Sequence, residues 1–415
     1  MISKKKLTNI FMYVYGFLLI FNPSNFFSFN LLFLLTVFSF CIIFFTKNSI
    51  ISFYSNKRFL VFTIFNICYF LYYFILSPDV DSNRGYTIFI TYLGVLNAYA
   101  FILIYIRNND LNFDKFLKFI TNIMLIQMFF VLLSVFIPEF RNWALSTARS
   151  DSLVSVSNDY GFMRSFGLSL SYTAGLPMAM GICSLFVAYF LIEEKNIFLK
   201  IRYLITLLLF LFAVVVNARI GLMPIIFLVI FLPLIVFAHI KNIFSYLAVM
   251  VGVIILYFIF SDSIKQSSYL ERMQEGVQEV ESFFAGRKEG NIEALYEMFI
   301  LPDNNYNLFF GQGLETFGNL SISSDIGLVR DVYMFGLLYV ILFFLVFYYL
   351  MKPLLGSFRE RFGYPFIIVF ILSLLAYYGK GMIYSSTEIY NLLFILCVFC
   401  CLKISLDRKN EGVIT

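Results

Sequence analysis

One polar stretch, residues 285–337, holds many of the side chains in this sequence that could bind an anion or move a proton. It contains Arg287, the pair Gly311 and Gly313, and Asp325 shortly before a new apolar run. An arginine can bind a phosphate group through two parallel hydrogen bonds, and glycines let backbone amides approach an anionic or sugar ligand closely. A carboxylate can accept a proton from a sugar hydroxyl. The stretch therefore predicts a site for a phosphorylated or sugar-containing ligand.

The same features also have structural interpretations, and these stay open at the level of sequence. Two glycines one residue apart, as at Gly311 and Gly313, are typical of a tight turn. Asp325 could be the N-cap of the apolar helix that follows, which is compatible with a role as a base. Glu293 and Glu297 are less favoured alternatives for the base.

Further cations suited to an anion site lie in the other polar segments, so that the candidates are Arg141, Arg149, Arg164, Arg219, Arg272, Arg287 and Arg330. Arg219 is the most informative, because it lies between two apolar runs, where a lone charge is costly unless it faces a polar cavity. It could also extend to the membrane surface from a helix end. Arg164 begins the sequence RSFGLSLSYTAG and could instead be an interfacial anchor.

Metal chemistry has weak support in the sequence. Asp79 and Asp81 form the type of aspartate pair that binds a divalent metal in many sugar-transferring enzymes, but they follow a proline in a turn and fit a solvated loop better. The single histidine, His239, ends an apolar run, so zinc ligands are lacking. We predict neither a metal nor a cofactor.

The composition indicates a polytopic membrane protein. Of the 415 residues, 61% are hydrophobic and only 13% are charged, whereas soluble domains are about a quarter charged. The net charge of +5 does not predict nucleic-acid binding, because the basic residues are scattered through short loops. All six cysteines fall inside apolar runs and are interpreted as packing residues.

Twelve apolar runs are long enough to cross about 30 Å of hydrocarbon, and they predict an all-α fold. They lie near residues 9–27, 29–46, 59–77, 87–106, 117–137, 173–192, 203–218, 220–238, 243–261, 332–351, 365–379 and 386–403. The seventh and eighth runs are separated only by a predicted hinge at residues 217–221.

The distribution of charge predicts the topology. With the N-terminus in the cytoplasm, 19 of the 30 Lys and Arg residues fall in cytoplasmic segments, and both termini are cytoplasmic. Two larger loops, 138–172 and 261–331, then lie outside. The second should contain an amphipathic helix over 268–284 and a short helix over 291–299. We treat residues 1–415 as one membrane domain.

The order of these motifs resembles that of Wzy-type polymerases of O-antigen or capsule repeat units, in the O-antigen polymerase and ligase superfamily. The resemblance rests on the Arg164–Gly175 stretch, on Asn217-Ala218-Arg219 at a helix junction, and on Gly-Arg, Phe-Gly-Gln-Gly, Ser-Asp-Ile-Gly-Leu and Phe-Gly-Leu-Leu in the second large loop and the run after it. As architecture it covers most of the chain, although the motifs are short.

The resemblance implies a metal-independent, inverting glycosyltransferase of GT-C-like fold in the bacterial inner membrane. It would transfer a growing glycan from undecaprenyl pyrophosphate to a new lipid-linked repeat unit, and a chain-length regulator protein could be a further partner. Asp325 would then orient or deprotonate the acceptor hydroxyl. The residues expected to bind pyrophosphate or substrate are Arg164, Arg219, Arg287, Arg330, Gly311 and Gly313.

Two other functions remain alternatives. An O-antigen ligase, which transfers glycan to the lipid A core, resembles the polymerases, but ligases usually carry a histidine near the position of Ser324 and Asp325. A flippase or other transporter of lipid-linked oligosaccharides usually keeps its working residues at the middle of the membrane. The apolar runs of this sequence are nearly free of charge, which favours the enzyme.

Overall fold

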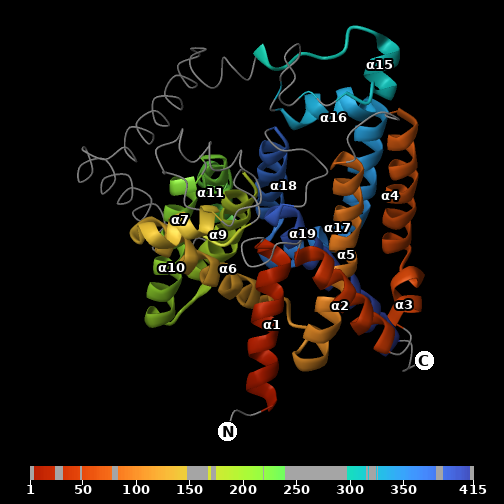
Figure 1. The fold of residues 1–415 in the computed structure, drawn as a ribbon. Coiled ribbons are helices and arrows are strands. Elements are labelled where there is room, and N and C mark those ends of the chain that lie inside the picture. The colour runs from red at the N-terminus through yellow and green to blue at the C-terminus, as the bar shows by residue number, and fades with distance from the viewer. Residues whose placement is uncertain are drawn as a thin grey trace.

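The computed structural model describes residues 4–23, 31–46, 49–76, 83–146, 167–169, 174–217, 219–238, 297–314, 316, 324, 326–379 and 387–411. Within these ranges the chain is almost entirely helical and forms no strand. Figure 1 shows the resulting bundle, with α15 and α16 across the top and the long helices running below them. The protein is therefore an all-α, multi-pass membrane protein.

The elements, in chain order, are α1 (Lys4–Phe21), α2 (Leu31–Phe45), α3 (Ser49–Ser55), α4 (Lys57–Leu76), α5 (Asn83–Asn108), α6 (Phe113–Phe136), α7 (Pro138–Ser146), α9 (Gly175–Glu193), α10 (Ile197–Asn217), the 3₁₀ turn η2 (Arg219–Leu222), α11 (Met223–Ala238), α15 (Asn305–Phe310), α16 (Gly327–Phe335), α17 (Leu337–Phe362), α18 (Tyr364–Tyr378) and α19 (Glu388–Glu411).

Seven helices in the described ranges are long and apolar enough to cross a membrane, namely α4, α5, α6, α9, α10, α17 and α19. Four shorter apolar helices, α1, α2, α11 and α18, lie over further predicted runs. The ninth predicted run, 243–261, is outside the described residues, so the total of twelve spans stays a prediction. The amphipathic helix predicted over 268–284 also lies outside them.

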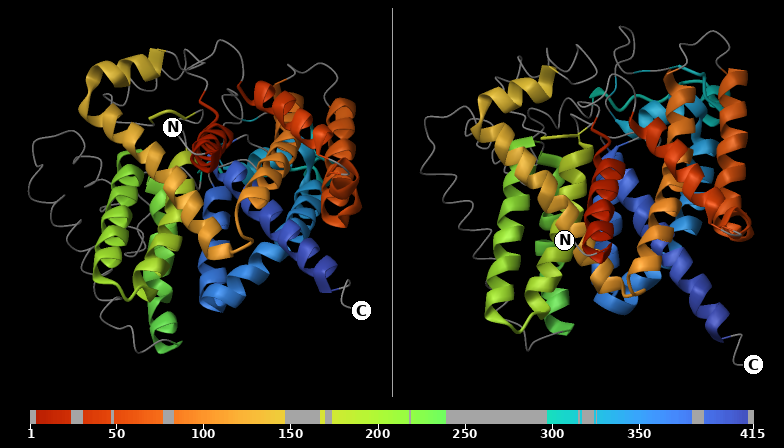
Figure 2. Two further views of the ribbon diagram at one scale, coloured as in Figure 1. Left: turned by 90° about the horizontal axis from the view of Figure 1, so that it is seen from below. Right: turned by 60° about the horizontal axis from the view of Figure 1, so that its bottom comes forward.

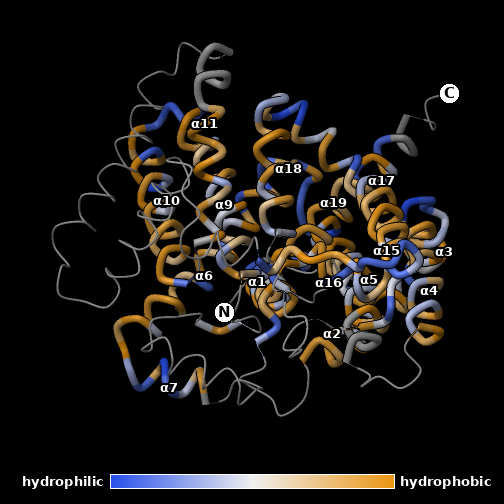
Figure 3. Tube along the Cα trace, turned by 90° about the horizontal axis from the view of Figure 1, so that it is seen from above, coloured by the Kyte–Doolittle hydropathy of each residue, from blue (hydrophilic) through white to orange (hydrophobic). Residues whose placement is uncertain are grey.

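Helix α9 is the centre of the bundle. Its residues from Gly175 to Ile192 are all buried, whereas α10 exposes apolar side chains such as Ile201 and Ile205. Figure 2 shows α9, α10 and α11 side by side, and Figure 3 shows hydrophobic colouring along most of α10, α11 and α17. Exposed apolar faces of this kind suit contact with lipid, because lipid tails are as apolar as leucine.

The predicted hinge between the seventh and eighth runs is present. Helix α10 ends at Asn217, η2 follows, and α11 begins at Met223. The turn packs tightly on α9, since a Cβ atom at Gly221 would lie 2.6 Å from the carbonyl carbon of Pro177. Only glycine permits so close an approach of the two backbones. The hinge is thereby fixed against the first turn of α9.

The tenth span begins later than its predicted start at residue 332. Residues 327–335 form the separate short helix α16, and the chain breaks at Gly336, which has φ 84° and ψ 163°. This backbone conformation is accessible essentially only to glycine. Asp331, the predicted last residue of the second large loop, lies within α16 and is fully buried.

The predicted loops also contain further short helices that the sequence did not indicate, among them α15, α7 and α3. Helix α7 follows α6 directly, and its Phe140 stacks on Phe130 with the ring centroids 6.2 Å apart. Helix α3 lies just before α4, where Phe53 stacks on Phe59 at 4.9 Å. All three are too short to span a membrane.

An ion cluster joins three helix ends at one end of the bundle. Arg361 near the end of α17 donates from Nε to Asp114 at the start of α6 over 2.7 Å, and from Nη1 to Glu193 at the end of α9 over 2.9 Å. On the same side, Arg107, Lys115 and Arg359 lie in terminal turns of α5, α6 and α17, and Lys195 lies between α9 and α10. We call this side the basic end and the opposite side, which carries α16, the α16 end.

Candidate functional site

The turn after α15 locks onto the junction of α16 and α17. The amide of Gln312 donates to the carbonyl of Tyr333 (2.8 Å), and the amide of Gly313 donates to that of Met334 (3.1 Å). Gly311, at φ 80°, donates to Asn307 (2.8 Å), and a Cβ atom there would lie 2.6 Å from the carbonyl carbon of Phe335. These three amides already have partners.

The predicted ligand-binding role of Gly311 and Gly313 therefore finds no support in the geometry. The tight-turn interpretation accounts for both glycines, because their positive φ angles of 80° and 68° let the turn approach Gly336. The turn also rests on α4, where the hydroxyl of Tyr72 donates to the carbonyl of Phe310. The motif thus positions α16 over the end of α4.

Helix α16 carries two adjacent ionisable residues, Arg330 and Asp331, at this end of the bundle. Asp331 is fully buried, while Arg330 is partly buried. Burial, followed by the negative charge of Asp303, raises the pKa of Tyr333 above its usual value. The phenol thus stays protonated at neutral pH and can donate a hydrogen bond.

Asp325 itself lies outside the described residues, but its neighbours are defined. Ser324 is buried, and its hydroxyl oxygen accepts a hydrogen bond from the amide of Ile326 over 3.2 Å. Ile326 is the N-cap of α16, and Gly336 is the N-cap of α17. The N-cap interpretation of Asp325 for the spanning helix is therefore wrong, since eleven residues separate it from Leu337, the start of that helix.

Sequence reasoning missed a buried carboxylate, Glu388. It is the first residue of α19 and is 1% exposed, and the buried hydroxyl of Ser169 donates to its Oε1. Nearby, the hydroxyls of Tyr377 and Thr387 share a hydrogen bond of 3.0 Å. A carboxylate beside a membrane span is costly unless it is hydrogen-bonded, so its position marks a functional candidate.

A second polar side chain continues this face along α19. Asn391 lies three residues after Glu388, and its amide donates to the carbonyl of Ile20 over 3.2 Å. Ile20 is in the last turn of α1, where backbone carbonyls have no partner within the helix. Asn391 thus satisfies one such group and sets the end of α1 against the start of α19.

The described parts of the predicted motifs gather at the α16 end. The antiparallel course of α17 and α18 brings Glu388 back to the end where α17 begins (Figure 1). The bond from Ser169 places the end of the first large loop there, and the contact of Gly221 with Pro177 places η2 beside the start of α9. Segments from three distant parts of the sequence therefore meet at one end.

Several candidate residues cannot be placed. Arg219 is in η2, but the structure describes its backbone and not its side chain. Arg164 and Arg287 lie outside the described residues, as do the Asp79 and Asp81 pair and His239. Within the described ranges, no group of three His, Cys, Asp or Glu side chains is arranged to hold a metal.

Comparisons with protein-family models, with curated proteins and with solved structures found no match to this chain.

Proposed function

We propose that the protein is a Wzy-type polysaccharide polymerase of the bacterial inner membrane, which joins undecaprenyl-pyrophosphate-linked repeat units of O-antigen or capsule. The observation that carries the proposal is the gathering of the motif segments at the α16 end, opposite the basic end. With the basic end in the cytoplasm, both termini are cytoplasmic and the α16 end faces the compartment where lipid-linked glycans are joined. This arrangement agrees with the motif order in the sequence.

In the proposed reaction, a hydroxyl of the acceptor sugar attacks the anomeric carbon of the donor chain. A carbon–oxygen bond forms there, the bond to the pyrophosphate breaks, and undecaprenyl pyrophosphate leaves with the electron pair. The leaving group is already good, so the protein needs to position the substrates and stabilise charge more than to donate a proton. Arg219, Arg164, Arg287 and Arg330 are the candidate cations, and Asp325 is the candidate acceptor of the hydroxyl proton.

A lipid-linked oligosaccharide transporter is the second candidate function, and a specific observation favours it. Glu388 and Asp331 are both buried at the α16 end, so the bundle contains more buried carboxyl groups than its apolar runs indicate. Buried carboxylates of this kind also occur along transport pathways. The ligase remains an alternative on the resemblance alone.

A strain that lacks the protein separates the three functions. Loss of a polymerase leaves single repeat units on the lipid A core, because export and ligation continue. Loss of a transporter leaves no repeat units there, and loss of a ligase leaves long chains on the carrier lipid. We expect single units, with length restored by the wild-type gene; either of the other two products would contradict the proposal.

A further inference from the structure

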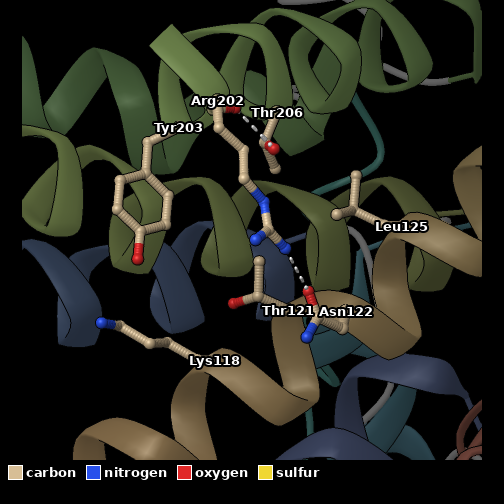
Figure 4. A pocket seen from close by; sticks show the side chains of 7 residues that line it. All are labelled: Lys118, Thr121, Asn122, Leu125, Arg202, Tyr203 and Thr206. Atoms are coloured by element: carbon tan, nitrogen blue, oxygen red, sulfur yellow. Dashed lines mark hydrogen bonds between the residues drawn. The ribbon is translucent and has the colours of Figure 1, made fainter. Parts of the chain in front are cut away.

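A small cavity opens between α6 and α10 at the basic end, far from the α16 end. Its volume is about 140 Å³, and Figure 4 shows the side chains that line it. Two are cations, Lys118 from α6 and Arg202 from α10. Each lies five residues into its helix, so both are roughly 8 Å from the helix start at 1.5 Å per residue.

Neither cation has a carboxylate partner in the part of the chain that the structure describes. Arg202 donates from Nη2 to the amide oxygen of Asn122 over 3.3 Å, and the amine of Lys118 lies 5.1 Å from the ring centroid of Phe190 and 5.8 Å from that of Tyr203. Arg361 at the same end differs, because it bonds two carboxylates. The cavity therefore holds two cations but no compensating anion.

The nearest carboxylates have other partners. A second cavity of about 310 Å³ shares Lys118 and Tyr203 with the first and is lined by Glu193 and Glu194. Glu193 accepts from Arg361, and Glu194 accepts from the backbone amides of Lys195 (3.0 Å) and Asn196 (3.1 Å). These two glutamates are thus held by their own hydrogen bonds rather than by the cations of the first cavity.

The uncharged walls supply few free donors. The hydroxyls of Thr121 and Thr206 donate to the carbonyls of Leu117 and Arg202, each over 2.9 Å. The amide of Asn122 donates to the hydroxyl of Tyr13 over 3.3 Å. The N–H groups left to bind a ligand belong mainly to Lys118 and Arg202, and such a donor set fits the oxygens of a phosphate group.

The surroundings favour a phosphate carried by a lipid. Farther along the same two helices, toward the α16 end, α10 exposes Ile205 and α6 exposes Phe129, so apolar surface continues beyond the cations. A lipid with its phosphate at Lys118 and Arg202 could lay its acyl chains along these side chains. A free phosphate would leave this apolar surface without an occupant.

We propose that the cavity between α6 and α10 binds the phosphate group of an anionic phospholipid from the leaflet at the basic end. The two cations, from adjacent helices that line the same cavity, bind the phosphate oxygens. The exposed apolar residues of α10 and α6 contact the acyl chains. The bound lipid would hold α6 against α10, which, in the part of the chain that the structure describes, are joined by one direct hydrogen bond, from Arg202 to Asn122.

The test uses the full-length protein in detergent, with binding followed by native mass spectrometry and by thermal unfolding. The ligands are phosphatidylglycerol, zwitterionic phosphatidylcholine and inorganic phosphate. The variant Lys118→Gln with Arg202→Gln removes both cations. The control, Lys57→Gln with Arg359→Gln, removes one exposed Lys and one exposed Arg from the same end. Arg202→Lys with Lys118→Arg keeps the charge and shows whether loss of binding reflects loss of folding.

We expect phosphatidylglycerol to bind the wild-type and control proteins more tightly than phosphatidylcholine does. Its affinity should fall about tenfold or more when both cations of the cavity are removed, and the charge-keeping variant should retain most of it. Equal binding to the cavity variant and the control would refute the site. Stabilisation by inorganic phosphate as large as that by phosphatidylglycerol would refute the lipid as the source. If the double Gln variant does not fold, Arg202→Gln alone is compared with Arg359→Gln on the same criteria.

Discussion

Three glycines in or next to α17 allow two effects of a glycine-to-alanine substitution to be measured separately. One effect is backbone strain at a positive φ, and the other is collision of the new Cβ atom with neighbouring atoms. Gly336 has φ 84°, and a Cβ atom there would lie 2.6 Å from the amide nitrogen of Gly311. Gly363 has nearly the same φ, 83°, but its Cβ atom would meet only Pro365, at 3.7 Å. Gly356, inside α17, has neither a positive φ nor an atom within 4 Å.

The three alanine variants should therefore differ in stability. Gly356→Ala should be neutral or stabilising by up to about 1 kcal/mol, because alanine is the better helix former. Gly363→Ala should cost about 1–3 kcal/mol from backbone strain alone. Gly336→Ala adds the collision with backbone atoms of the α15 turn, which cannot move without breaking its bonds to α16, so its cost should exceed that of Gly363→Ala.

The assay is thermal unfolding of each purified variant in one detergent, with membrane abundance measured alongside. The expected order of stability is Gly356→Ala, then Gly363→Ala, then Gly336→Ala. Equal unfolding temperatures for Gly336→Ala and Gly356→Ala would refute the claim that the turn after α15 is locked onto the α16–α17 junction. A larger loss for Gly363→Ala than for Gly336→Ala would refute the role assigned to the collision.

Three further predictions follow from single side chains. Arg361→Ala should destabilise the protein by about 1–2 kcal/mol, since it leaves Asp114 and Glu193 unpaired in a partly solvated cluster, and no change in the unfolding temperature would contradict this. Glu388→Ala should be less stable than Glu388→Gln by about 1–3 kcal/mol, because only glutamine keeps an acceptor for the buried hydroxyl of Ser169; equal stability of the two would contradict it. Asp325→Asn should lower glycan elongation strongly at unchanged membrane abundance, and glycan ladders of normal length would leave the search for the base to Glu293, Glu297 and Glu388.

The long helices were predictable because each follows a long apolar run, and the hinge at residues 217–221 was visible as polar and small residues between two such runs. Which helix is central was not predictable. Core-facing and lipid-facing surfaces are both apolar, so hydropathy does not distinguish the buried α9 from the exposed face of α10. The structure separates them through burial.

The candidate site was predicted only in part. Gly336 breaks the tenth run, but a lone glycine among apolar residues does not reveal the positive φ that causes the break. Glu388 was missed because it stands near the start of the predicted run 386–403, where it resembles an ordinary helix-end residue, and its partner Ser169 is 219 positions away in the sequence. Contacts of that range have no local signal.

Arg219 gives the most direct test of the proposed function. The full-length protein is purified, incubated with a defined undecaprenyl-pyrophosphate-linked repeat unit, and the products are resolved by mass spectrometry. We predict a ladder of glycans that differ by one repeat unit, with release of undecaprenyl pyrophosphate. Arg219→Ala should abolish most of the ladder and Arg219→Lys should reduce it, because lysine keeps the charge but loses the bidentate fork. A wild-type protein that forms no ladder, or an Arg219→Ala variant that forms one of normal length and amount, would contradict the account.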